Sequence, residues 1–138
     1  TMPLSPVDDL LEDGDDYLSG LGLRGDPHQW LLISAPEHPI IRRALEMSIR
    51  NIRDRTWAPG FSPQEGYAGP PVLHEAALEV LGVDHLEAGT YTTTGSCGGG
   101  MNARLLAGDH LDGTVLFKYD GYYDDLREMG MRHWGESG

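Results

Sequence analysis

The stretch "QWLLISAPEHPIIRRALE" (29–46) decides the fold class, because it places a strand directly before a helix. Its first part, "QWLLIS" (29–34), is a short apolar run between breakers, which predicts a buried strand. From Pro39 to Arg53, apolar residues recur at helical spacing, and proline suits the first turn of the predicted helix. The predicted inner positions are Ile41, Ala44, Leu45, Ser48, Ile49 and Ile52, and the outer ones are Arg42, Arg43, Arg50 and Arg53.

The flanking segments extend this α/β pattern. Upstream, "TMPLSPVDDLLEDGDDYL" (1–18) predicts a loop, then a short helical turn over 7–11 and an acidic surface run. Downstream, 56–71 predicts an ordered loop and 71–81 a second helix that ends at Gly82. The Gly/Thr stretch 89–100 predicts a flexible segment, and "TVLFKY" (114–119) a strand. Without an internal repeat, the pattern indicates one domain.

Composition narrows the classes of partner. The chain has 138 residues and a net charge of −12, which argues against a nucleic acid or an anionic membrane as the main partner. Its single cysteine, Cys97, excludes an internal disulfide and a cysteine-rich zinc site. No run is long and apolar enough for a membrane span, and no signal peptide is recognisable. An anchor upstream of Thr1 stays open.

Three groups of residues suggest chemistry but favour plainer interpretations. The acidic run 13–16 resembles a calcium loop but lacks the required glycine and glutamate, so it predicts a solvated loop. "GSCGG" (95–99) has the spacing of a nucleophile elbow, but its flanks favour a mobile loop. Four histidines lie too far apart for metal-ligand spacing and are interpreted as surface or interface residues: His28, His74, His85 and His110.

Two further motifs leave their alternatives open. At Gly69-Pro70-Pro71 a helix begins, which suits an anion site, but two prolines remove donors, so tight packing and ligand approach are equally consistent. His133 and Ser137 beside Trp134 offer nitrogen and oxygen donors that suit manganese or magnesium near a diphosphate. The alternative for this ending is a strand with a half-buried tryptophan.

Taken in order, five segments resemble the second half of a glycosyltransferase family with an Asp-x-Asp motif. That family includes the fungal initiating α-1,6-mannosyltransferase of the Golgi, bacterial capsule and lipopolysaccharide sugar transferases and, more distantly, the clostridial glucosylating toxins. The segments are "TMPLSPVDDLL", "QWLLISAPEHPIIRRALE", "AGPPVLHEAAL", "TVLFKYDGYY" and "HWGES". Two features depart from the family: the Asp-x-Asp pair expected before Thr1 is not in these residues, and Gly138 stands where the family has tryptophan.

The resemblance implies a GT-A type, Rossmann-like α/β fold of nucleotide-diphospho-sugar transferases, with residues 1–138 as the C-terminal portion of one such domain. The substrate site is expected at the carboxyl ends of a mostly parallel sheet. The implied activity is retaining transfer of a hexose from a GDP- or UDP-hexose donor to a hydroxyl of a glycan, glycolipid or protein acceptor. Mn²⁺ or Mg²⁺ is the implied cofactor.

The resemblance also assigns roles. His133 and Ser137 are implied metal ligands, with Ser137 also able to bind a phosphate, and Trp134 packs against the site. Gly69 and Pro70 approach the donor or acceptor. His38 matches a family landmark too, but its place at a helix start favours a structural cap over catalysis.

The resemblance leaves two alternatives for the cellular location and does not exclude other classes of protein. The family implies the Golgi lumen in a eukaryote or the cytoplasmic face of the inner membrane in a bacterium, with membrane association through an upstream region. A chain without the Asp-x-Asp half is expected to be inactive alone, and to be marginally stable or to associate. The alternatives are a non-catalytic carbohydrate- or nucleotide-binding remnant and a hydrolase or redox protein that depends on Cys97. The donor sugar, its base and the acceptor are not identified.

Overall fold

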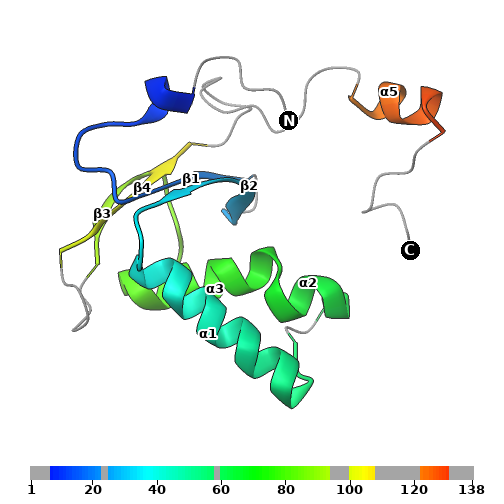
Figure 1. The fold of residues 1–138 in the computed structure, drawn as a ribbon, viewed down its shortest axis with the longest axis horizontal. Coiled ribbons are helices and arrows are strands. Elements are labelled where there is room, and N and C mark those ends of the chain that lie inside the picture. The colour runs from blue at the N-terminus through cyan, green and yellow to red at the C-terminus, as the bar shows by residue number, and fades with distance from the viewer. Residues whose placement is uncertain (1–6, 23–24, 58–59, 94–99, 108–121, 131–138) are drawn as a thin grey trace.

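A mixed four-stranded sheet with three helices on one of its faces forms the centre of the described structure (Figure 1). The computed structural model describes residues 7–22, 25–57, 60–93, 100–107 and 122–130. The strands lie in the order β2-β1-β4-β3. Their bounds are β1 Tyr17–Leu21, β2 Pro27–Ser34, β3 Gly89–Thr92 and β4 Asn102–Leu106. The helices are η1 Val7–Leu10, a 3₁₀ helix, and α1 Pro39–Asp54, α2 Pro63–Ala68, α3 Pro70–Leu81 and α5 Tyr122–Glu128.

The pairing of the strands confirms an α/β chain but differs from the expected sheet. β1 pairs antiparallel with β2 and parallel with β4, and β4 pairs antiparallel with β3. Two of the three described pairings are therefore antiparallel, whereas we expected a mostly parallel sheet. The parallel pair requires a crossover, which runs through β2, the helices α1 to α3 and β3.

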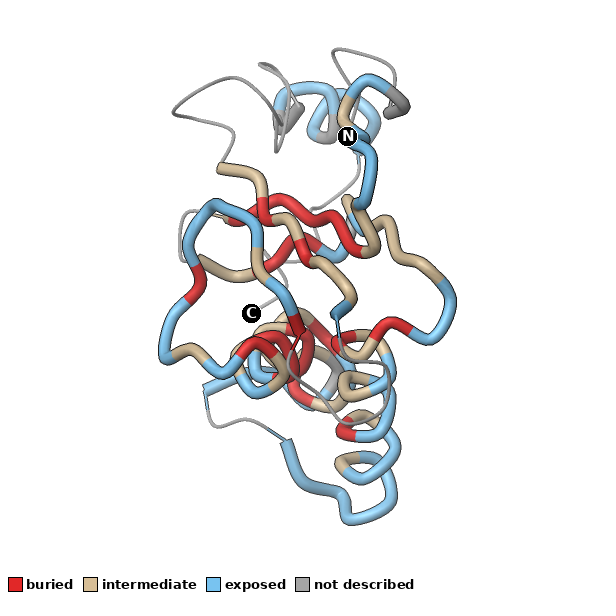
Figure 2. Tube along the Cα trace, turned by 90° about the vertical axis from the view of Figure 1, so that its left-hand side faces the viewer, coloured by how far each residue is buried: buried red, intermediate tan, exposed pale blue. Residues whose placement is uncertain are grey.

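All five residues of β1 are buried, so the central strand is covered on both faces (Figure 2). Tyr17 and Leu21 belong to the core cluster that β1 shares with β4 and the helices. That cluster also includes Ile40, Leu73, Ala77, Leu81, Leu86, Ala103 and Leu105. Leu18 alternates to the opposite face, where it is completely buried.

On that opposite face, Arg104 fixes the segment before β1. Its Nε lies 2.9 Å from Asp15 Oδ1, its Nη1 lies 3.1 Å from Glu12 Oε1, and its Nη2 donates to the Leu10 carbonyl. The hydrogen bond from Arg104 holds the pKa of Asp15 below its usual value. Asp16 accepts the Asn102 N–H at 2.8 Å. The prediction of a solvated acidic loop over 13–16 is therefore wrong for Asp15, whose side chain is buried by this pair.

The two long helices agree with the sequence prediction in their bounds. The predicted helices 39–53 and 71–81 correspond to α1 and α3, and the predicted strand 29–34 lies within β2. Gly82 ends α3 with a φ of 69°, the left-handed conformation that glycine favours. His38 is the N-cap of α1, since its Nδ1 accepts the Ile40 N–H at 3.3 Å, which confirms the predicted cap.

The sequence prediction missed α2 inside the expected loop 56–71. This helix begins at a capping box: Ser62 Oγ accepts the Glu65 N–H, and the Glu65 carboxylate accepts the Ser62 N–H. The strands β1, β3 and β4 and the helix α5 were not predicted either. The predicted strand 114–119 and the "GSCGG" loop lie outside the described residues.

The predicted inner face of α1 is wrong in three positions. Leu45, Ile49 and Ile52 have exposed fractions of 59%, 58% and 58%, whereas Ile40 and Met47 are buried. The helix packs on the sheet and on α3 through the side that carries Ile40, Ala44 and Met47. Its apolar residues cover more of the helix surface than these contacts bury, so periodicity alone does not identify the buried side.

This assignment is testable by two truncations on one helix. We expect Met47→Ala to lower the free energy of unfolding by about 2–5 kcal/mol, because it leaves a cavity under a side chain that is 2% exposed. Ile49→Ala should change it by no more than about 0.5 kcal/mol, as is usual for an exposed position. Urea titrations followed by circular dichroism measure both, and a larger loss for Ile49→Ala would contradict the orientation of α1.

Candidate functional site

The structure describes only some of the predicted site residues. Gly69 and Pro70 lie at the junction of α2 and α3, where Gly69 is both the residue after α2 and the N-cap of α3. His133, Trp134 and Ser137 lie outside the described residues, as do His110 and Cys97. The site can therefore be built around the α2–α3 junction.

At the junction, glycine is required by packing. The Gly69 N–H donates to the Glu65 carbonyl at 2.8 Å, which brings the chain back against the last turn of α2. A Cβ added at Gly69 would lie 2.8 Å from Glu65 Cα and closer still to its carbonyl oxygen. Since real Cβ atoms do not approach backbone so closely, the geometry accounts for glycine through packing within the protein. Contact of Gly69 and Pro70 with a substrate stays a prediction.

The N-terminus of α3 offers little to an anion. Pro70 and Pro71 have no N–H, and the N–H groups of Val72 and Leu73 both point to the Gly69 carbonyl, at 3.0 and 3.4 Å. A helix start normally presents about four unpaired N–H groups. Here two of those four positions are prolines, the Gly69 N–H donates to the Glu65 carbonyl, and the Val72 N–H donates to the Gly69 carbonyl. A ligand at the junction would therefore have to bind to side chains.

Three polar side chains belong to the segments beside the junction, and we call them the junction cluster: Asp26, Gln29 and His74. Gln29 Nε2 donates to the Ala68 carbonyl at 3.3 Å and so ties β2 to the end of α2. His74, in the second turn of α3, places Nδ1 3.3 Å from Asp26 Oδ1. That separation fits an ion pair when the imidazole is protonated, but its angles are not those of a hydrogen bond.

The junction cluster is accessible and chemically versatile. The side chains of His74 and Asp26 are 28% and 43% exposed, but His74 Nδ1, which faces Asp26, is itself buried, so only the outer part of the imidazole is accessible. A carboxylate accepts hydrogen bonds, and an imidazole donates or accepts them. These are the groups that bind sugar hydroxyls, and together they carry no excess positive charge for a phosphate.

His38 has a structural role and is not part of the junction cluster. Its ring stacks on Tyr17 with centroids 5.1 Å apart, and both residues are almost completely buried. Burial lowers the pKa of His38 and raises the pKa of Tyr17 to about 12, because the charged form of each is poorly solvated. His38 therefore stays neutral and keeps Nδ1 free to accept the Ile40 N–H.

The other histidines separate into different environments. His28 is buried at 7% exposure, so its interpretation as a surface residue is wrong. His85 is exposed and lies 3.1 Å from the Glu87 carboxylate. Within the described part of the chain, no group of three or more His, Cys, Asp or Glu residues could hold a metal ion. In the same residues, no helix is long and apolar enough to cross a membrane.

Sequence reasoning missed Asp26 and Gln29 and did not connect His74 to them. The only local signal was that His74 lies one turn after the Gly-Pro helix start. The approach of β2 to α3 is tertiary and has no such signal. Comparison with protein-family models, curated proteins and solved structures finds no match for the chain.

The packing role of Gly69 predicts a stability effect without any ligand. We expect Gly69→Ala to lower the free energy of unfolding by about 1–3 kcal/mol, the usual cost of overpacking a tight site. Gly82→Ala is a control that tests backbone conformation alone, since a Cβ there meets nothing within 4 Å; we expect about 1–2 kcal/mol. Unchanged stability of Gly69→Ala in a urea titration would leave ligand approach as the reason for glycine.

Burial of the His38 cap predicts that the free energy of unfolding depends on pH. Because the pKa of His38 is lower in the folded state than in the unfolded chain, unfolding takes up a proton when the pH falls below about 6.5. The stability that neutral His38 contributes is therefore complete above that pH and is lost as the pH falls toward the folded-state pKa.

We expect His38→Asn, which keeps a good cap that does not titrate, to lose less stability than the wild type between pH 7.5 and pH 5.5. Urea titrations at both pH values give the difference. His85→Asn, at an exposed position, is the control and should follow the wild type. Equal losses for wild type and His38→Asn would show that the cap histidine does not contribute.

Proposed function

We propose that this chain is part of a retaining, metal-dependent hexosyltransferase of the GT-A type and contributes the second half of that domain. The proposal is supported by five sequence segments that resemble the glycosyltransferase family in their order along the chain. It is also consistent with the α/β architecture and with the parallel pairing of β1 and β4. The antiparallel pairs at both edges are the part of the sheet that a mostly parallel sheet would not have.

The observation that carries the proposal is the surroundings of the Gly69-Pro70 landmark. The resemblance implies that this landmark meets the donor or acceptor. Beside it are an amide from β2 that donates to the Ala68 carbonyl, and an imidazole from α3 that faces the carboxylate of Asp26, the residue before β2. We assign the junction cluster to the hydroxyl groups of a hexose or of the acceptor glycan. Asp26 would accept hydrogen bonds from these hydroxyls and His74 would orient them.

In this proposal the diphosphate of the donor binds away from the junction. The N–H groups at the start of α3 are already used, and the junction cluster brings no unpaired cation. We assign the leaving diphosphate to the C-terminal segment, where His133 and Ser137 would hold Mn²⁺ or Mg²⁺ and Trp134 would pack beside them. A divalent cation there would neutralise the charge that develops on the leaving group.

The test is hydrolysis of GDP- and UDP-hexoses by the longest natural polypeptide that contains these residues, with and without Mn²⁺. We expect metal-dependent turnover, and we expect His133→Ala to lower kcat by about 100-fold or more through loss of charge stabilisation. His85→Ala is the control, because that histidine is exposed and paired only with Glu87 among the described residues. His74→Ala should raise KM more than it lowers kcat, since it removes substrate binding.

The possible outcomes distinguish the transferase from the two alternative classes of protein. Binding of a sugar nucleotide without turnover would replace the enzyme by a carbohydrate- or nucleotide-binding remnant. Turnover that Cys97→Ser abolishes and His133→Ala leaves unchanged would indicate a cysteine-dependent hydrolase. Metal-dependent turnover that His133→Ala lowers and His74→Ala leaves unchanged would keep the transferase and remove the junction cluster from it.

A further inference from the structure

The outer side of α1 carries an unusual concentration of exposed apolar side chains, which we call the α1 face: Leu45, Ile49 and Ile52. Their spacing of four and three residues places them on one side of a helix with about 3.6 residues per turn. They are among eight large apolar side chains that the described structure exposes, and Trp57 and Phe61, later in the chain, belong to the same eight. An isolated exposed leucine is ordinary, but a contiguous helical face usually marks an interaction surface.

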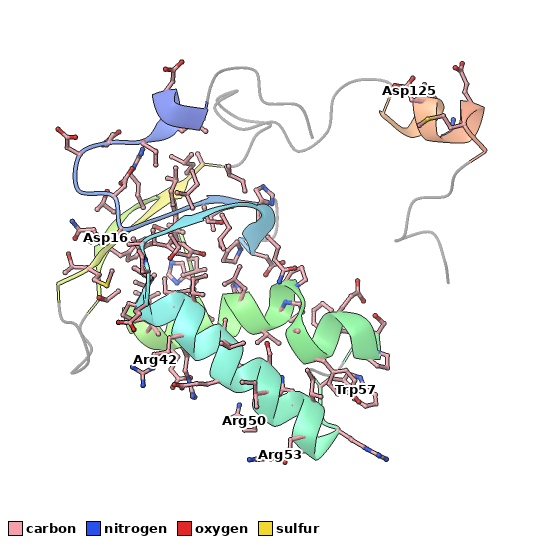
Figure 3. The ribbon with its side chains drawn as sticks, in the orientation of Figure 1. Asp16, Arg42, Arg50, Arg53, Trp57 and Asp125 are labelled. Carbon is pink, nitrogen blue, oxygen red and sulfur yellow. The ribbon has the colours of Figure 1, made fainter. Side chains whose placement is uncertain are left out.

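Arginines border this face. Arg42, Ile49 and Arg53 follow one line along the helix, since they are separated by seven and four residues. Figure 3 shows Arg42, Arg50 and Arg53 along the side of α1 that points away from the sheet. The segment 42–55 contains five arginines and two acidic residues, a net charge of +3 in a chain whose total is −12.

The acidic residues near the N-terminus lie on the other side of the molecule. Asp9, Glu12 and Asp13 belong to η1 and its following loop, which Figure 1 shows across the sheet from α1. At physiological salt the Debye length is about 8 Å, so an approaching surface responds mainly to the charges nearest to it. The negative total charge therefore does not prevent α1 from meeting an anionic partner.

We propose that the α1 face docks on an anionic lipid bilayer, with Leu45, Ile49 and Ile52 at the boundary between headgroups and acyl chains and the arginines among the phosphates. A helix with an apolar face and an arginine-rich border has the composition of interfacial helices. At 16 residues α1 lies along the surface in this arrangement and does not span the bilayer. The proposal is independent of hexose transfer.

Charge argues against a second copy of the chain as the occupant. Arg42 and Arg53 lie on either side of Ile49 along the helix. If two α1 faces packed together, parallel or antiparallel, arginines of one copy would oppose arginines of the other. Ion pairs offset some of this charge: Arg42–Glu46 at 3.2 Å, Arg43–Glu79 at 2.9 Å and Arg53–Asp54 at 2.6 Å. Arg50 has no ion-pair partner within 4 Å among the described residues.

The test is co-sedimentation of the full chain with vesicles of phosphatidylcholine alone or with added phosphatidylglycerol. We expect binding only to the anionic vesicles, and weaker binding as the salt concentration rises. Arg53→Gln should weaken binding by roughly fivefold, the contribution of one arginine near an anionic leaflet. Ile49→Gln/Ile52→Gln should weaken it by roughly tenfold or more, through loss of apolar burial.

The control variants make the same kinds of substitution at exposed positions outside the α1 face. Arg127→Gln removes one exposed arginine on α5, and Leu11→Gln/Met129→Gln removes two exposed apolar side chains, and both should bind as the wild type does. Circular dichroism verifies that each variant folds. The proposal is overturned if the wild type ignores phosphatidylglycerol or if the controls lose binding equally. It is also overturned if light scattering detects a dimer that Ile49→Gln/Ile52→Gln dissociates, because a second copy then covers the face.

Discussion

The rest of the structure depends on the burial of β1 on both of its faces. On one face Tyr17 packs into the core and stacks on His38, and because His38 also caps α1, this contact positions the start of the helix against the sheet. On the other face, the pair between Arg104 and Asp15 ties β4 to the segment that leads into β1. This pair is partly buried, so removing either partner would leave the other charge with less compensation, and the pair helps to hold the two segments together. Strand pairing, helix placement and the position of η1 all follow from these contacts.

The parts of this fold that sequence predicts are the parts that local chemistry specifies. The bounds of α1 and α3 follow from apolar periodicity, an early proline and a terminal glycine, all of which act within a few residues. β1, by contrast, reads "YLSGL" after an acidic run, and β4 has Arg104 at its centre. Neither looks like a buried strand until the other is beside it, because β4 supplies the hydrogen bonds of β1 and Asp15 neutralises Arg104. For the same reason, periodicity identified α1 as a helix but placed Ile49 on its buried side, since the buried side is chosen by α3 and the sheet.

The candidate site also has features that the sequence predicts and features that only tertiary packing creates. The sequence identifies the Gly69-Pro70 helix start and the cap at His38, since both are local features. Asp26 and His74 come together because β2 packs against α3, and Gln29 of β2 also donates to the Ala68 carbonyl at the end of α2. The same packing also explains Gly69 without a ligand. A glycine before a helix is therefore ambiguous from sequence, because the backbone of its own protein and a substrate can each require the missing side chain.

The two prolines after Gly69 limit the chemistry of any ligand that would bind at the junction, because they remove two backbone N–H groups. An unmodified helix start would offer backbone N–H groups to a phosphate, and the attraction would grow with the charge of the ligand. Here those donors are absent or already bonded, while the nearby side chains are one carboxylate, one imidazole and one amide. A carboxylate repels a phosphate and binds a hydroxyl, so a ligand bound at the junction as proposed would meet it with a neutral part that carries hydroxyl groups. In a transferase this would separate recognition of the sugar or acceptor at the junction from neutralisation of the diphosphate at another segment, and the positions of Pro70 and Pro71 would enforce that separation.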